Sequence, residues 1–168
     1  MSEHHHQGEA QFLEGLVPTA NSYIRPFPAD TEIKGIEYEG PSHSGPYRGA
    51  VDFLVPTETP VLMPQTGRVI EVVDSHTRYG PTEEFATDLN YVTLMHANGE
   101  FSQVAHLKQG SAIVQVGDIV EQGQRIATSG NSGWQTEPHI HFYVFTTFSA
   151  IENGGLVRKF EGRRIRFE

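Results

Sequence analysis

The chain has 168 residues, no cysteine and a formal net charge of −9, from 12 basic and 21 acidic residues. Without cysteine, neither a disulfide framework nor a thiolate metal site can form, and the acidic balance makes nucleic acid and anionic membranes poor partners. A chain of this length fits one domain, and 17 glycines and 10 prolines favour β structure with tight turns over a helix bundle.

The predicted elements begin after a polar leader at residues 1–20, which is expected to be flexible. It contains His4–His6, which we exclude from any active site. Residues 21–168 are expected to form the single domain. Within it, a loop rich in glycine and proline at residues 40–46 precedes a β-branched and aromatic strand at residues 50–55.

Alternating apolar runs continue through the rest of the domain. Further strands are predicted at residues 61–63, 67–73, 91–96, 101–106, 139–145 and 156–167. The third and fourth of these form a hairpin around Asn98-Gly99, and the polar stretch 74–88 is expected to be a long surface loop. Because no segment has a helical pattern, the predicted architecture is all-β, a single-domain antiparallel β-sheet with sandwich-like packing.

A group of histidines and one aspartate could bind a metal. His139 and His141 lie two positions apart on a predicted strand, so their imidazoles project from the same face. Such a pair can bind a metal or divide between metal binding and catalysis, although two polar residues on a solvent face give the same pattern. Asp52 lies inside an apolar strand, where an unpaired charge is costly, so it requires a cationic partner. That partner is either Arg48 or a metal, and His43 lies in a loop that can fold back toward Asp52.

Several motifs, in order over residues 43–145, resemble peptidase family M23, of the lysostaphin and LytM type. They are Val51-Asp52-Phe53, Pro56-Thr57-Glu58-Thr59-Pro60-Val61, Gly67-Arg68-Val69, Val104-Ala105-His106-Leu107, Val116-Gly117-Asp118, Gly123-Gln124, Gly130-Asn131-Ser132-Gly133 and Pro138-His139-Ile140-His141-Phe142. The resemblance implies a LytM-like fold with a duplicated hybrid motif. It also implies a zinc metalloendopeptidase that hydrolyses peptide bonds in peptidoglycan cross-links or stem peptides.

The resemblance also implies roles for particular residues. In that family an early histidine, an aspartate and the second histidine of the final pair hold Zn²⁺, which here are His43, Asp52 and His141. The remaining two histidines, His106 and His139, then flank the reacting water, and which of them is the general base stays open. Three protein ligands with one open position are typical of catalytic zinc, which polarises the scissile carbonyl and activates water.

The spacing between the first two ligands differs from the commonest family pattern, His-x-x-x-Asp. Counting back from Asp52, that pattern reaches Arg48, which cannot bind zinc. The sequence therefore resembles a subgroup with a longer loop between histidine and aspartate, in which His43 is the ligand. His76 is the other candidate, but it lies in a loop without motif support. The sequence contains no His-Glu-x-x-His motif, so a thermolysin-type site is not expected.

Two other functions fit the same β architecture. A non-catalytic LytM-like binding or activator module would be expected to lack ligands, whereas all five positions here carry the expected residue types. The family resemblance implies that M23 peptidases share their fold with IIA-type phosphocarriers. A phosphocarrier of this type would use paired histidines for phosphoryl transfer. Asp52 within an apolar strand fits a metal better than a phosphohistidine.

The expected partner is a peptide or peptidoglycan substrate, without nucleic acid and without an integral membrane segment. No export signal precedes the domain, so we expect an extracytoplasmic location, in periplasm or cell wall, if a leader has been removed, and a cytoplasmic one otherwise. Oligomeric state and cleavage specificity do not follow from the sequence. Among the remaining candidates, His96 is expected to be structural, and Trp134 and Tyr143 are expected to be core aromatics rather than parts of a substrate groove.

Overall fold

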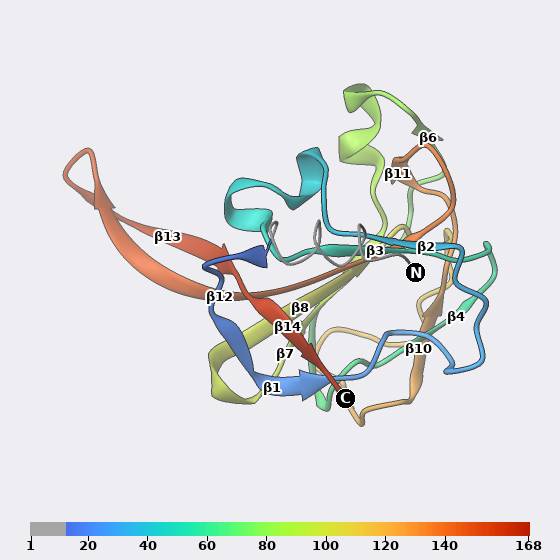
Figure 1. Cartoon of the computed structure of the whole chain (residues 1–168), viewed down its shortest axis with the longest axis horizontal. Helices are drawn as coiled ribbons and strands as arrows, with labels where there is room; N and C mark the ends of the chain where they lie inside the picture. The colour runs from blue at the N-terminus through green and yellow to red at the C-terminus, as the bar shows by residue number, and fades with distance from the viewer. Residues whose placement is uncertain (1–12) are drawn as a thin grey trace.

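The computed structural model describes residues 13–168, so most of the predicted leader lies outside the described range. Within that range the chain folds into strands connected by loops and short 3-10 turns (Figure 1). The strands are β1 (Pro18–Tyr23), β2 (Gly35–Glu37), β3 (Val51–Leu54), β4 (Pro60–Leu62), β5 (Gly67–Val73), β6 (Tyr79–Gly80), β7 (Tyr91–Met95), β8 (Glu100–Ala105), β9 (Ile119–Val120), β10 (Arg125–Thr128), β11 (Gly133–Trp134), β12 (Ile140–Glu152), β13 (Gly155–Gly162) and β14 (Arg164–Phe167). The 3-10 turns are η1 (Pro41–His43), η2 (Gly45–Tyr47), η3 (Glu83–Asp88) and η4 (Ala97–Gly99). The predicted all-β architecture is confirmed.

One antiparallel sheet organises the molecule. Its strand order is β2-β3-β12-β8-β7-β5-β9, and β13 pairs with β12 beyond this path. The central strand β12 lies between β3 and β8, and its register places His141 opposite Asp52 on one side and Ala105 on the other. The end of β8 and the middle of β3 therefore meet at the start of β12, although they are far apart in the sequence.

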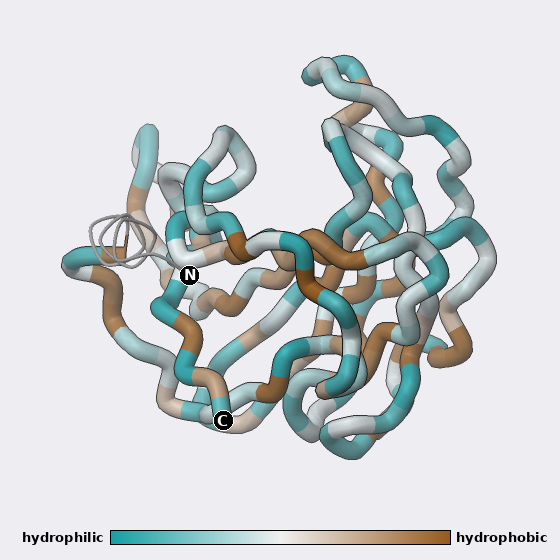
Figure 2. The backbone as a smooth tube through the Cα atoms, turned by 45° about the vertical axis from the view of Figure 1, so that its right-hand side comes forward, coloured by the Kyte–Doolittle hydropathy of each residue, from teal (hydrophilic) through white to brown (hydrophobic). Residues whose placement is uncertain are grey.

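The hydrophobic core lies against this sheet and explains its register. Val51, Phe53, Val104, Ile140 and Phe142 are each at most 1% exposed. In Figure 2 the loops that project at the top of the view are mostly hydrophilic, and most of the strongly hydrophobic segments lie below them in the body of the molecule. Because side chains alternate along a strand, burying this apolar set leaves the residues between them on the opposite face.

The first residues of β12 are buried on both faces. Ile140 and Phe142 enter the core, while His141 and Tyr143 lie on the other face and are also buried. The Tyr143 hydroxyl donates to the Pro46 carbonyl, and its ring packs 5.5 Å from that of Tyr47, so η2 covers this face. Farther along, β12 and β13 form a long hairpin that extends from the body of the molecule (Figure 1).

Part of the segment predicted as a leader belongs to the folded body. β1 pairs in parallel with β14. Its backbone N–H groups at Ala20 and Asn21 donate to the Glu100 carboxylate at 2.6 and 3.1 Å, and the Tyr23 hydroxyl donates to the same group at 2.9 Å. Glu100 is only 2% exposed. A buried carboxylate thus anchors β1 to the start of β8.

The strands predicted between residues 50 and 145 are present, whereas β2, β9 and β10 were not predicted, the predicted strand 156–167 is divided into β13 and β14, and the loop at residues 74–88 contains further structure. The hairpin at residues 91–106 is confirmed, with η4 at its turn. The loop contains β6, which pairs in parallel with β11, and η3. A two-residue strand carries too few residues for an alternating pattern, so the sequence could not reveal it. In residues 13–168, no helix is long and apolar enough to span a membrane.

Candidate metal centre

A single carboxylate lies at the centre of the histidine cluster. Asp52 Oδ1 accepts a hydrogen bond from His141 Nδ1 at 2.9 Å and lies 3.1 Å from His43 Nε2. Its second oxygen, Oδ2, lies 3.6 Å from His139 Nε2. The side chains in contact with Asp52 are thus histidines, which can hold a metal cation beside it, while Arg48 donates to the Glu14 carbonyl oxygen at 2.7 Å.

His43 reaches the cluster from the last position of η1, beside the glycine- and proline-rich loop. Its side chain is 1% exposed, and its ring packs edge-on against that of His141 with 5.1 Å between centroids. Within residues 13–168, neither ring nitrogen of His43 has a hydrogen-bond partner of normal geometry. Apart from the 3.1 Å contact of Nε2 with Asp52, this buried imidazole is unsatisfied, which is costly and favours an additional ligand such as a metal ion.

The donor set fits a zinc ion. His43, Asp52 and His141 each offer one ligand atom, and these atoms lie within 4.8 Å of one another. Two imidazole nitrogens and one carboxylate oxygen are ligands that zinc accepts, and three protein ligands leave the fourth tetrahedral position open for substrate. The other sequence candidate, His76, lies outside this group and has its Nδ1 3.9 Å from Asp88 Oδ1.

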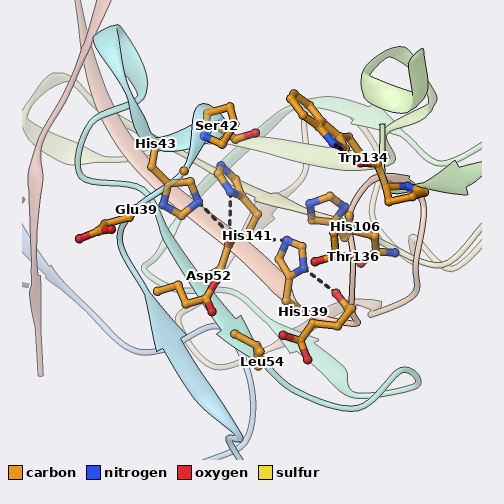
Figure 3. Close-up of a pocket in the computed structure, with 16 residues that line it drawn as sticks. Glu39, Ser42, His43, Asp52, Leu54, His106, Trp134, Thr136, His139 and His141 are labelled. Atoms are coloured by element: carbon orange, nitrogen blue, oxygen red, sulfur yellow. Dashed lines mark hydrogen bonds and ion pairs between the residues drawn. The ribbon is translucent and has the colours of Figure 1, made fainter. Parts of the chain in front are cut away.

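The two remaining histidines face the same space from another side. The His106 and His139 ring centroids are 4.2 Å apart, and His106 lies 6.2 Å from the His141 ring. In Figure 3 the rings of His106, His139 and His141 gather around one space, with Trp134 on one side of it and His43 on the other. His106 and His139 both use Nδ1 to donate to a backbone carbonyl, of Ser132 at 2.6 Å and of Glu137 at 2.9 Å. In the neutral tautomer, each Nε2 is then free to accept a proton.

Burial sets the charge states in the cluster. For Asp52, burial favours the neutral acid, but the contacts with His141 and His43 outweigh it and hold the pKa well below its usual range. Burial, with a smaller contribution from the nearby His139, lowers the pKa of His106 to about 3. Burial also lowers the pKa of His141, and Asp52 opposes this shift. For Asp52 and His141, an ionised carboxylate beside a neutral imidazole is the protonation state that binds metal.

A polar network that the sequence analysis missed holds His106 in place. His106 has a left-handed backbone conformation, with φ 68°, which is uncommon outside glycine and is found at functional sites. Its N–H donates to the Asn90 carbonyl at 3.0 Å, and the Asn90 side chain donates to the Leu107 carbonyl at 3.2 Å. The Ser132 hydroxyl accepts from Asn90 N–H at 3.0 Å and donates to the Leu107 carbonyl at 3.0 Å. The only sequence signal was Ser132, inside the Gly130–Gly133 motif.

All five candidate residues line one open cavity of about 370 Å³. A second cavity of about 410 Å³ shares His106, His141 and Trp134 with it and adds Tyr47 and Tyr91. Trp134 is half-buried, and its Nε1 donates to the Pro81 carbonyl at 3.1 Å, so the expectation of a core tryptophan was wrong. Tyr143 is a core residue, as expected, with 1% exposure.

His96 also has the structural role expected for it. Its Nδ1 bonds to the Thr66 carbonyl at 3.0 Å, and its Nε2 bonds to the Ser102 hydroxyl at 2.7 Å.

Comparison with known families identifies this arrangement. The model for peptidase family M23 matches residues 46–153, more than half of the chain. The chain belongs to peptidase family M23. M23 peptidases are zinc-dependent, in agreement with the donor set of His43, Asp52 and His141. His43 lies just before the matched range.

The matches to individual relatives cover somewhat more than half of the chain. The chain is 35% identical over 97 residues to the peptidoglycan DD-endopeptidase ShyA of Vibrio cholerae, covering 58% of this chain and 20% of the relative. It is also 35% identical over 97 residues to the glycyl-glycine endopeptidase ALE-1 of Staphylococcus capitis, covering 57% of this chain and 24% of the relative. The chain thus spans about a quarter or less of these curated relatives. The crystal structure of a zinc-containing peptidase from Vibrio cholerae superposes with a TM-score of 0.54 at 24% identity, over 82% of this chain and 39% of that one, and shows a shared fold.

Proposed function

We propose that this M23 protein is a zinc-dependent endopeptidase that cleaves peptide bonds in peptidoglycan. The observation that carries the proposal is the convergence of three candidate ligands and two further histidines on one open cavity. A structural zinc site would be closed by a fourth ligand, whereas this site leaves space for a substrate. The names of the two relatives support peptidoglycan and glycyl-glycine bonds as the substrate class.

The residues that line the cavity would have different roles in hydrolysis. His43, Asp52 and His141 would hold zinc, which supplies Lewis-acid activation of the scissile carbonyl and of water when it is bound. Because their Nδ1 atoms are committed to backbone carbonyls, His106 and His139 each have Nε2 available to take a proton from the attacking water, and the pKa of about 3 makes His106 a weaker base than a free imidazole. The same pair can return that proton to the leaving amine, which a peptide bond requires before it breaks.

Substrate charge also fits this assignment. Glu37, Glu39 and Glu137 line the cavity together with Asp52, and among the described lining residues there is no lysine or arginine. Such a lining favours neutral or cationic peptide segments over anionic ones. A substrate in the cell wall would place the enzyme outside the cytoplasm.

The proposal is tested by zinc content and peptide hydrolysis in the same preparation. The protein should carry one zinc per chain and release products from purified peptidoglycan or from an oligoglycine peptide. His141→Ala should abolish both. As a matched control, His76→Ala removes an imidazole outside the candidate group and should leave both intact. Full hydrolysis by His141→Ala would show that the proposed site is wrong.

A further inference from the structure

Gln135 carries an unsatisfied amide at the edge of the proposed active site. The residue is 8% exposed, and neither Nε2 nor Oε1 has a hydrogen-bond partner among residues 13–168. Most buried amides find partners, because leaving both the donor and the acceptor unpaired costs stability. A group that is unpaired in the free protein is a candidate for pairing with a ligand.

The backbone around Gln135 is fixed, so the unpaired amide does not result from a loose loop. Its N–H donates to the Gly80 carbonyl at 2.9 Å, which continues the parallel pairing of β11 with β6. Gly133 lies two residues earlier at φ 84°, and a Cβ there would approach Leu89 to 2.8 Å, so only glycine fits this close approach. The loop holds the Gln135 backbone in one place while leaving its side chain without partners.

Two cavities adjoin Gln135. Gln135 lines the 370 Å³ cavity that contains the candidate metal ligands, and it also lines a third, smaller cavity of about 220 Å³ together with Thr136 and Glu137. The glutamine side chain has three rotatable bonds, so its amide can turn into either space without moving the backbone. An incoming chain in the cleft therefore meets a donor and an acceptor at this wall.

We propose that the Gln135 amide binds the backbone of one substrate residue, with Nε2–H donating to its carbonyl oxygen and Oε1 accepting from its N–H. The backbone N–H and C=O of one residue in an extended peptide point to the same side, so a single substrate residue can pair with both atoms of the carboxamide at once. The inference rests on the proposed peptidase function and adds a specificity-determining residue to it. The unpaired amide lowers the stability of the free enzyme, and substrate binding relieves that cost.

A near-isosteric variant separates this role from a structural one. Gln135→Met keeps the side-chain length but removes both polar atoms. Because two neutral hydrogen bonds to substrate are lost, kcat/KM for an oligoglycine peptide should fall roughly ten- to a hundredfold. Because no hydrogen bond within the protein is lost, Tm should stay the same or rise by roughly 2–4 °C, with zinc content unchanged. Gln135→Ala provides a second variant with the same expected fall in kcat/KM.

Gln122 offers a matched control, because its amide is satisfied. Its Nε2 donates to the Pro64 carbonyl at 3.1 Å and to Glu168 Oε2 at 2.8 Å. Gln122→Met should therefore lower Tm and leave kcat/KM unchanged, the reverse of the result expected at position 135.

Two results would overturn the role of Gln135, namely an unchanged kcat/KM or a fall in both Tm and kcat/KM. If the zinc-loaded wild type hydrolyses no peptide, the proposed function fails separately. Calorimetric binding of the oligoglycine peptide to wild type and Gln135→Met then decides this inference. Weaker binding by the variant supports it, and equal affinities overturn it.

Discussion

Replacing His43 by alanine removes one of the three candidate zinc ligands and leaves Asp52 and His141 in place. His43 is the ligand whose position the family spacing predicts least well, so this substitution tests the centre at its most informative point. In the metal-free protein the imidazole is 1% exposed and has no hydrogen-bond partner of normal geometry among the described residues. Its removal there costs packing and the contact with Asp52, whereas in the zinc-bound protein it also costs a ligand.

The expected magnitude follows from linkage between binding and folding. Zinc at a hundred times its dissociation constant stabilises the folded state by about 2.7 kcal/mol. For a domain of this size that raises Tm by roughly 5–10 °C. Loss of a residue that hydrogen-bonds to a metal ligand lowers metal affinity by up to about a hundredfold. Loss of a coordinating imidazole should lower zinc affinity at least as much. At the same zinc concentration the stabilisation then falls to about 0.4 kcal/mol or less, a Tm shift of roughly 1 °C.

The assay compares thermal unfolding with chelator and with added zinc, together with the zinc content of dialysed protein. Packing losses cancel, because the measured quantity is the difference in Tm between the two conditions for each variant. His76→Ala is the control, since its half-exposed ring lies outside the candidate group. One zinc per chain and a full zinc-dependent rise in Tm for His43→Ala would refute the assignment and place the third ligand elsewhere.

Three further predictions follow from the described contacts. His106→Gln and His139→Gln should each retain zinc but lose roughly 10²- to 10⁴-fold in kcat, and normal turnover by both would contradict their catalytic role. Glu100→Gln should lower the unfolding free energy, measured by urea titration, by about 2–4 kcal/mol. The reason is that the buried carboxylate accepts hydrogen bonds from two backbone N–H groups and from Tyr23. A smaller loss of unfolding free energy than that caused by Tyr23→Phe would count against this anchor. Burial lowers the pKa of His96, so the unfolded chain binds a proton more readily than the folded one, and stability should fall as the pH drops below about 6.5. In chelator-treated protein, His96→Gln should flatten that fall, and an identical slope would show that another group causes it.

Local patterns were enough to predict most of the sheet. Alternation and β-branched composition placed the strands around Asp52 and after His139, and the Asn98-Gly99 pair marked the hairpin turn. These signals are reliable because each depends on neighbours within a few residues. The short pair of β6 and β11 depends instead on contacts between residues 79–80 and 133–134, which no local pattern records.

The candidate site shows the same division between local and distant information. The sequence marks His43, Asp52 and His141 by residue type and motif, and the structure brings them together, while their roles as ligands stay a prediction. The support for His106 could not be predicted, because Asn90 and Ser132 contact each other across 42 positions in the chain. A left-handed conformation at a histidine likewise has no sequence signature, since the surrounding hydrogen bonds impose it.

The Asp52 carboxylate connects the metal centre to the proposed proton-transfer pair. Strand alternation predicts only that His139 and His141 share a face, and it assigns them no separate roles. In the structure, Oδ1 of Asp52 contacts His141 and His43, while Oδ2 lies 3.6 Å from His139. One oxygen thus faces the candidate ligands and the other faces a catalytic candidate. β3 and β12 pair in register at Asp52 and His141. The backbone hydrogen bonds of this strand pair therefore also position the two carboxylate oxygens of Asp52, one toward the candidate ligands and the other toward His139.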